Sequence, residues 1–122
     1  MQISSTDFET KSPEELIQWA IDQYGLKAGL ACSFGMEDMI LIDIIAKLKG
    51  PITIFTLDTG RLHEETYDIM EKVRSHYGLE IKTYFPDLEQ IEKLVRKKGF
   101  FSFRESIENR KECCAIRKIE PL

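Results

Sequence analysis

The sequence predicts an α/β fold in which helices flank a parallel sheet. Segments with helical periodicity alternate with short β-rich runs, in the order of one helix followed by three strand–helix pairs. Strands separated by helices form parallel sheets with right-handed crossovers. The 122 residues, of which 43% are hydrophobic and 31% charged, suffice for one domain with a packed core.

The first half of the chain carries clear start and stop signals. Residues 12–15, Ser-Pro-Glu-Glu, form a capping box with proline at the first helical position, and Gly25 is expected to end that helix. Residues 30–34 are predicted to form a buried strand. Residues 39–48 are apolar almost all round, as in a helix that is covered on most sides.

The second half continues the alternation and then loses it. Residues 52–57 are predicted to form the second strand, and a helix with one apolar face is expected from His63. Residues 81–85 alternate in polarity, as an edge strand does. Asp87 is expected to cap a further helix, whereas no helical period follows Gly99.

Composition indicates a cytoplasmic protein without a membrane partner. No stretch approaches the roughly 18 consecutive apolar residues of a membrane span. The first 15 residues are polar and acidic, unlike a secretory signal. Three cysteines, an odd number, argue against a disulfide framework and favour reduced thiols that are core residues or metal ligands.

Basic residues gather near the end of the chain. Residues 93–118 contain nine basic and three acidic side chains, although the net charge is −4. Such a segment can be a solvated face. A nucleic-acid surface is disfavoured because the whole chain is acidic, so no nucleic-acid partner is expected. The motifs favour a third interpretation, an anion site for a small phosphorylated ligand.

Two loops follow predicted strands, where ligands bind in open parallel sheets. The loop 32–38 precedes a helix, whose free N–H groups, together with the Ser33 hydroxyl, can hold phosphate or sulfate. An ordinary strand–helix turn is the alternative. In the loop 57–61, Asp58 could accept hydrogen bonds from a sugar or base, or could cap the next helix.

Cys113 and Cys114 form the third motif. Adjacent cysteines rarely pair with each other, and two thiolates beside Arg117 and Lys118 suit a metal or cluster because nearby cations lower thiol pKa values. Iron–sulfur clusters usually have four thiolate ligands. The remaining cysteine, Cys32, lies in an apolar strand and is expected in the core, so two ligands are missing.

Taken together, three segments carry a family resemblance. GMEDMILID, FTLDTGRLHEETYDIMEKVR and ECCAIRKIEPL resemble, in this order, the adenylyl-sulfate and phosphoadenylyl-sulfate reductases of sulfate assimilation. The likeness implies a Rossmann-like fold of the adenine nucleotide alpha hydrolase type. It also implies an oxidoreductase of cysteine biosynthesis that cleaves adenylyl sulfate to sulfite and AMP. Thioredoxin or glutaredoxin would be the reductant, after a cysteine near the C-terminus attacks the sulfur.

The resemblance also implies site residues. Those that match nucleotide-facing positions are Ser33, Gly35, Leu57, Asp58 and Thr59. Cys113 and Cys114 match two ligands of a [4Fe–4S] cluster. Lys118 matches a lysine between cluster and substrate, where a cation can neutralise charge that develops on the leaving phosphate.

Two departures from related patterns stand out. The ATP pyrophosphatases have a Ser-Gly-Gly-x-Asp-Ser loop, in which Phe34 here replaces the first glycine and Asp38 the final serine. This favours reductases over pyrophosphate-releasing ligases. No residue matches the family's second cysteine pair or its nucleophile, so residues 1–122 are predicted to be the truncated N-terminal part of one domain, inactive alone. Residues 1–98 would bind nucleotide and residues 99–122 would be an irregular tail.

Alternatives remain open at this point. The parent enzyme could act on phosphoadenylyl sulfate, or the chain could be a nucleotide-binding module without turnover. The cysteine pair favours adenylyl sulfate, because reductases specific for the 3′-phosphorylated form typically lack the cluster. The first strand carries no charge or proline to protect its edge, so a homodimer or higher oligomer is expected.

Overall fold

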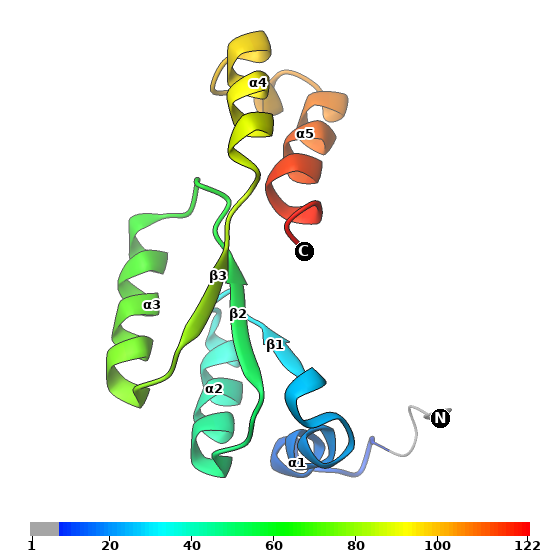
Figure 1. Cartoon of the computed structure of the whole chain (residues 1–122), viewed down its shortest axis with the longest axis vertical. Helices are drawn as coiled ribbons and strands as arrows, with labels where there is room; N and C mark the ends of the chain where they lie inside the picture. Colours follow the sequence, from blue (N-terminus) through cyan, green and yellow to red (C-terminus); the bar gives the residue numbers. More distant parts are fainter. Residues whose placement is uncertain (1–7) are drawn as a thin grey trace. The chain divides into compact units, whose positions relative to one another are not determined.

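The computed structural model describes residues 8–122 and confirms the predicted α/β fold (Figure 1). Its parallel sheet has the order β1-β2-β3, with strands Gly29–Ala31, Thr53–Leu57 and Ile81–Tyr84. In the β1–β2 pair, Leu30 lies opposite Ile54. The predicted edge strand, β3, is at one end of this order.

Helices connect and follow the strands. The α-helices are α1 (Pro13–Tyr24), α2 (Met36–Leu48), α3 (Glu64–Tyr77), α4 (Leu88–Lys98) and α5 (Ile107–Cys114). The shorter segments are the 3₁₀ turns η2 (Gly25–Lys27) and η3 (Ser102–Arg104) and the π-helical turn η4 (Ala115–Ile119). No helix within residues 8–122 is both long and apolar enough to cross a membrane.

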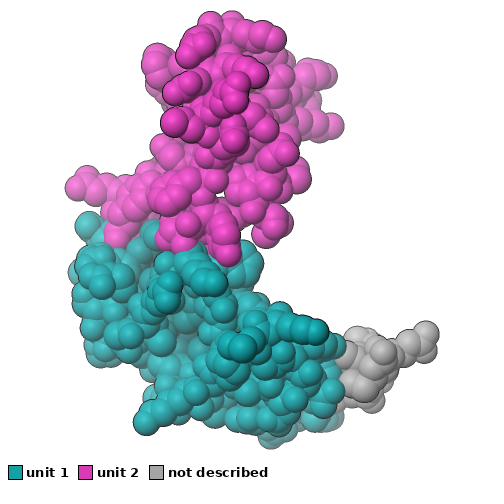
Figure 2. All heavy atoms as spheres, in the orientation of Figure 1, with its two compact units in different colours: residues 1–55, 68–82 teal, residues 56–67, 83–122 magenta. Residues whose placement is uncertain are grey.

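The chain forms two compact units, coloured separately in Figure 2. Among the described residues, the first unit comprises residues 8–55 and 68–82, and the second comprises residues 56–67 and 83–122. The sequence predicted a different division, into a nucleotide-binding part (residues 1–98) and a tail (residues 99–122). That functional division stays a prediction.

The core of the first unit is apolar and joins α2, α3 and the sheet. Ile42 and Ile45 of α2 pack with Ile54 of β2 and Val73 of α3 in one buried cluster. Cys32 belongs to the same cluster and is 5% exposed, which confirms that this cysteine is a core residue. Burial of these side chains away from water is the main force that holds the unit together.

The cap signals of α1 hold in the structure. The Ser12 hydroxyl accepts a hydrogen bond from the Glu15 backbone N–H at 3.2 Å, and Pro13 is the first helical residue. The helix ends before Gly25, whose φ of 51° is in the left-handed range that glycine tolerates.

Two boundaries in the first unit differ from the predicted ones. β1 ends at Ala31 rather than at Phe34, which has a positive φ of 62° and leads into the turn before α2. Helix α2 begins at Met36 rather than at Met39. Part of its surface is exposed, since Met36 is 84% and Ile40 58% exposed. Although α2 is apolar on almost every side, other described residues do not cover all of its sides.

The predicted irregular tail, residues 99–122, is partly helical in the second unit. Asp87 caps α4 by accepting from the Gln90 N–H at 3.0 Å, as predicted. Beyond Gly99, however, the chain is helical again, because Ser106 caps α5 by accepting from the Asn109 N–H at 3.0 Å. The eight residues of α5 have no apolar stripe, so periodicity alone could not reveal the helix.

Contacts within the second unit hold α5 beside α4. The Lys98 ammonium lies 2.8 Å from the Asn109 side-chain oxygen and 3.2 Å from a Glu112 carboxylate oxygen. Both helices are drawn side by side in Figure 1. After α5 the backbone widens into η4, in which the Glu120 N–H donates to the Ala115 carbonyl at 2.9 Å.

Candidate functional site

The loop after β2 is built around one carboxylate. Asp58 is 7% exposed, and its Oδ1 accepts from the Gly60 N–H at 2.8 Å and from the Tyr67 hydroxyl at 2.8 Å. The bond to Gly60 closes a tight turn of the kind that aspartate favours. Gly60 has a φ of 78°, which a residue with a side chain adopts only with strain.

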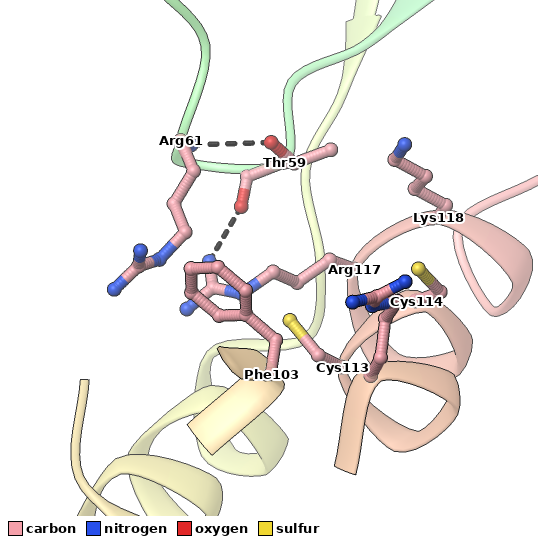
Figure 3. Close-up of a pocket in the computed structure, with 8 residues that line it drawn as sticks. Thr59, Arg61, Phe103, Cys113, Cys114, Arg117 and Lys118 are labelled. Atoms are coloured by element: carbon pink, nitrogen blue, oxygen red, sulfur yellow. Dashed lines mark hydrogen bonds between the residues drawn. The ribbon is translucent and has the colours of Figure 1, made fainter. Parts of the chain in front are cut away.

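The same loop is tied to η4 through Arg117. The Thr59 hydroxyl accepts from the Arg61 N–H at 3.1 Å, and the Thr59 carbonyl accepts from Arg117 Nη1 at 2.5 Å (Figure 3). A Cβ placed on Gly60 would lie 3.2 Å from Arg117 Nη1, which is tighter than ordinary contact. Glycine therefore leaves room for the arginine to reach the loop.

A pocket of about 310 Å³ opens between this loop and the cysteine-bearing helix of the same unit. It is shown in Figure 3 and is lined by Thr59, Arg61, Phe103, Arg110, Cys113, Cys114, Arg117 and Lys118. Four of these eight residues are cations and none is acidic. A small anion is therefore the ligand that the pocket's charge favours.

One donor in the pocket wall stands out. Arg117 Nε is buried, and among residues 8–122 it is the single buried side-chain nitrogen or oxygen without a hydrogen-bond partner. An unpaired buried donor costs about 1–3 kcal/mol. Arg117 thus holds the loop with one nitrogen while another nitrogen of the same guanidinium stays unsatisfied.

Arginine and phenylalanine side chains stack beside the pocket. The Arg61 guanidinium carbon lies 5.2 Å from the Phe101 ring centre and 5.0 Å from that of Phe103. Arg104 lies 4.4 Å from the Phe101 ring centre. The Arg61 guanidinium also donates to the Phe100 carbonyl. These contacts orient Arg61 at the pocket wall.

The first predicted loop belongs to the other unit and has an internal partner. One carboxylate oxygen of Asp38 accepts from the Ser33 N–H at 3.0 Å, from the Ser33 hydroxyl at 3.0 Å and from the Gly35 N–H at 3.2 Å. The donors expected to hold a phosphate therefore already face a carboxylate of this chain. Ser33 and Gly35 stay predicted substrate contacts, but an anion there would have to compete with Asp38.

Burial governs the chemistry of Cys32. The pKa of this thiol is raised to about 11, mainly by burial; a hydrogen bond with the Phe34 backbone opposes the rise, and the nearby Asp38 charge adds to it. The thiolate is the nucleophilic form of cysteine. Cys32 is therefore a neutral thiol near pH 7 and unsuited to attack a substrate.

The predicted site residues separate into groups. Thr59, Cys113, Cys114 and Lys118 all line the one pocket. Leu57 ends β2, next to the loop, but does not line the pocket. The pocket residues that no motif predicted as site residues are Arg61, Phe103, Arg110 and Arg117. Arg117 stands inside the recognisable Cys-Cys-Ala-Ile-Arg-Lys segment, so that segment was the available signal.

Fold and site together define the class: an α/β protein whose cationic, thiol-bearing pocket adjoins the loop after the second strand of a parallel sheet. The family model described as "Phosphoadenosine phosphosulfate reductase domain" matches residues 27–122. The chain therefore belongs to the phosphoadenosine phosphosulfate reductase domain family, as the resemblance indicated.

Relatives share close to half of the aligned residues. A Pseudomonas aeruginosa protein named adenosine 5′-phosphosulfate reductase is 45% identical over 112 residues, which are 92% of this chain and 41% of the relative. A chloroplastic 5′-adenylylsulfate reductase of Arabidopsis thaliana is 43% identical over 114 residues, which are 93% of this chain and 24% of the relative. The chain thus spans about two fifths or less of these relatives.

A solved structure supports the fold. The crystal structure of the phosphoadenylyl-sulfate reductase from Candida auris, a phosphate complex, superposes with a TM-score of 0.80 at 24% sequence identity. The likeness covers 99% of this chain and 61% of that chain.

The expected [4Fe–4S] cluster is wrong for this chain. The matched family model and the structural neighbour carry the name of phosphoadenosine phosphosulfate reductases, and neither description mentions a cluster. Residues 8–122 also offer no group of three or more cysteine, histidine or acidic residues able to hold a metal. Cys113 and Cys114 supply two thiols, while Cys32 is enclosed in the core of the other unit. The donor set does not fit the cluster, and no step is derived through it.

Proposed function

We propose that this chain supplies part of the substrate site of an enzyme that reduces adenylyl sulfate to sulfite and AMP in sulfate assimilation. The observation that carries the proposal is the pocket in which four cations surround two thiols and the Thr59 loop. Relatives that are 43–47% identical carry names of adenylyl-sulfate reductases, which supports the same reaction.

In this proposal the pocket binds the phosphosulfate end of the substrate. The cysteine nucleophile attacks the sulfur, the bond between sulfur and the bridging oxygen breaks, and AMP leaves with that oxygen. Lys118 and Arg110 neutralise the negative charge that develops on the leaving phosphate. A second thiol then attacks the enzyme thiosulfonate, so that sulfite leaves and a disulfide forms.

A dithiol protein such as thioredoxin or glutaredoxin is the proposed reductant, because release of sulfite needs two electrons. The nucleophile is not proposed among the three cysteines of this chain. Cys32 is neutral and buried, and Cys113 and Cys114 match other positions in the family. We therefore expect the 122-residue polypeptide to bind substrate without forming sulfite.

The proposed substrate is adenylyl sulfate rather than its 3′-phosphorylated form. The names of the relatives support this choice, whereas the family description and the Candida auris protein carry the name of the phosphorylated substrate. A nucleotide-binding module without turnover is the second candidate function, because the cationic pocket could hold a phosphorylated ligand without any reaction.

Calorimetry with both sulfonucleotides tests the proposal on the 122-residue chain. We expect adenylyl sulfate to bind, and Lys118→Ala to weaken binding about tenfold through loss of one charge-assisted contact. Lys72→Ala, which removes a lysine of the first unit outside the cationic pocket, is the matched control and should bind as the wild type does. Equal affinity in all three proteins would remove the pocket from the substrate site.

The edge of the sheet offers a surface for association. We infer a homodimer joined through the outer edge of β1, whose residues Gly29 and Ala31 are exposed. An unprotected edge is a template for pairing with a second chain. The cytoplasmic location expected from the sequence stays a prediction.

A further inference from the structure

Tyr67 contacts the substrate-site loop from outside the pocket. Its hydroxyl donates to Asp58 Oδ1 at 2.8 Å, the oxygen that also accepts the Gly60 N–H at 2.8 Å. Tyr67 lies on α3 and is absent from the pocket lining. Its contact with the turn at Gly60 is made through Asp58.

The geometry makes Asp58 dependent on this hydroxyl. Asp58 is 7% exposed, so water cannot readily replace a lost donor. Hydrogen bonds to a carboxylate are stronger than those between neutral groups. With the Tyr67 and Gly60 bonds both made, the Asp58 side chain has one orientation, and the turn at Gly60 is fixed.

The Asp58–Gly60 turn also places Thr59 in the pocket wall. The Thr59 carbonyl faces Arg117 Nη1 at 2.5 Å, and a change in the turn would move both that acceptor and the loop. Burial, and after it the bond with Asp58, raise the pKa of Tyr67. The proton therefore stays on the tyrosine and remains available for donation at neutral pH.

We propose that Tyr67 is a positioning residue, which holds the Asp58–Gly60 turn so that Thr59 and Arg117 are set for the sulfonucleotide. This proposal rests on the proposed function for its ligand. Its structural half, the dependence of the turn on the Tyr67 hydroxyl, does not.

The chain provides a matched control on the same helix. Tyr77 of α3 also donates to an aspartate, Asp43, at 3.0 Å. Asp43 lies in the first unit, binds Lys47 at 2.7 Å and lines no part of the cationic pocket. Removal of either hydroxyl deletes one tyrosine–aspartate hydrogen bond, but only the Tyr67 bond holds the turn.

The experiment compares Tyr67→Phe with Tyr77→Phe in two measurements. Tyr67 is 38% exposed, so loss of its hydroxyl is expected to leave the fold intact. Hydrogen exchange of the Gly60 amide, without ligand, should accelerate about tenfold in Tyr67→Phe and stay unchanged in Tyr77→Phe. Calorimetry with adenylyl sulfate should show about tenfold weaker binding in Tyr67→Phe alone.

The two readouts separate the possible failures. Unchanged Gly60 exchange in Tyr67→Phe would overturn the proposal, and so would equal losses of affinity in both variants, since these would indicate a general effect of stability. If the wild type binds no adenylyl sulfate, the proposed function fails, while Gly60 exchange still decides whether Tyr67 holds the turn.

Discussion

Asp38 accepts three hydrogen bonds on a single oxygen, from both donors of Ser33 and from the Gly35 N–H. This carboxylate closes the turn before α2 by accepting from the N–H of Gly35, the N-cap residue of that helix. The donors of this loop therefore face a carboxylate of the same chain, with which an anion would have to compete.

Removal of that carboxylate should destabilise the protein. Asp38→Ala leaves three donors without their acceptor, and we expect a loss of about 1–3 kcal/mol in the free energy of unfolding. Urea unfolding measures it. Glu37→Ala, which removes the exposed neighbouring carboxylate, should cost under about 0.5 kcal/mol. Similar losses in both variants would contradict the special role of Asp38.

Because the pKa of Cys32 is raised in the folded state, the free energy of unfolding should change with pH in the alkaline range. The unfolded thiol ionises near 9, whereas the pKa of the folded thiol is about 11, so between these values the unfolded state loses the proton first. Stability from this group is complete below pH 9 and falls as the pH rises towards 11. Thermal unfolding from pH 8 to 11 should show a shallower decline in Cys32→Ala than in the wild type. Parallel declines would mean that Cys32 ionises equally in both states.

At the scale of the element, α5 depends on its N-cap. Ser106 accepts from the Asn109 N–H at 3.0 Å, and the eight-residue helix has little else to fix its start. Ser106→Ala should lower the free energy of unfolding by about 1 kcal/mol. Ser106→Asp, which keeps a capping oxygen, should restore most of it. If the aspartate variant is no better than alanine, the cap is not what stabilises α5.

The turn after β2 depends on the absence of a side chain at Gly60. Its φ of 78° strains any other residue, and an added Cβ would lie 3.2 Å from Arg117 Nη1. Gly60→Ala should therefore destabilise the chain by about 1–2 kcal/mol and weaken the Arg117 contact. Gly78→Ala provides the control, because Gly78 has a similar φ of 63° but no atom within 4 Å of a Cβ. Both variants share the strain, so equal effects on sulfonucleotide affinity would show that the Arg117 contact is irrelevant.

At the scale of the whole molecule, the free edge of β1 governs association. β1 pairs with β2 on one side, and its residues Gly29 and Ala31 are exposed. Ala31→Lys places a charge on that edge, which opposes strand pairing. Light scattering over a range of concentrations should show a wild-type dimer and an Ala31→Lys monomer. A concentration-independent wild-type monomer would refute the edge as an interface.

The sequence by itself determined the features that arise from neighbouring residues. Ser12 and Asp87 cap helices where their spacing predicted, and strands and helices alternate along the chain as predicted up to α4. The motifs also named Thr59, Cys113, Cys114 and Lys118, which line one pocket. Caps and periods act over a few residues, so their signals can be seen in a linear sequence.

Only the tertiary structure decided which side chains complete the pocket. It also decided which hydrogen-bond donors of the first loop are paired with Asp38. Arg117 reaches Thr59 across 58 positions of the chain, and Arg61 stacks on Phe103 from a loop 42 positions away. The pairing of Ser33 with Asp38 is local, yet it depends on how the turn before α2 folds. Such contacts leave no period or cap in the sequence, because their energy comes from groups that only folding brings within hydrogen-bonding distance.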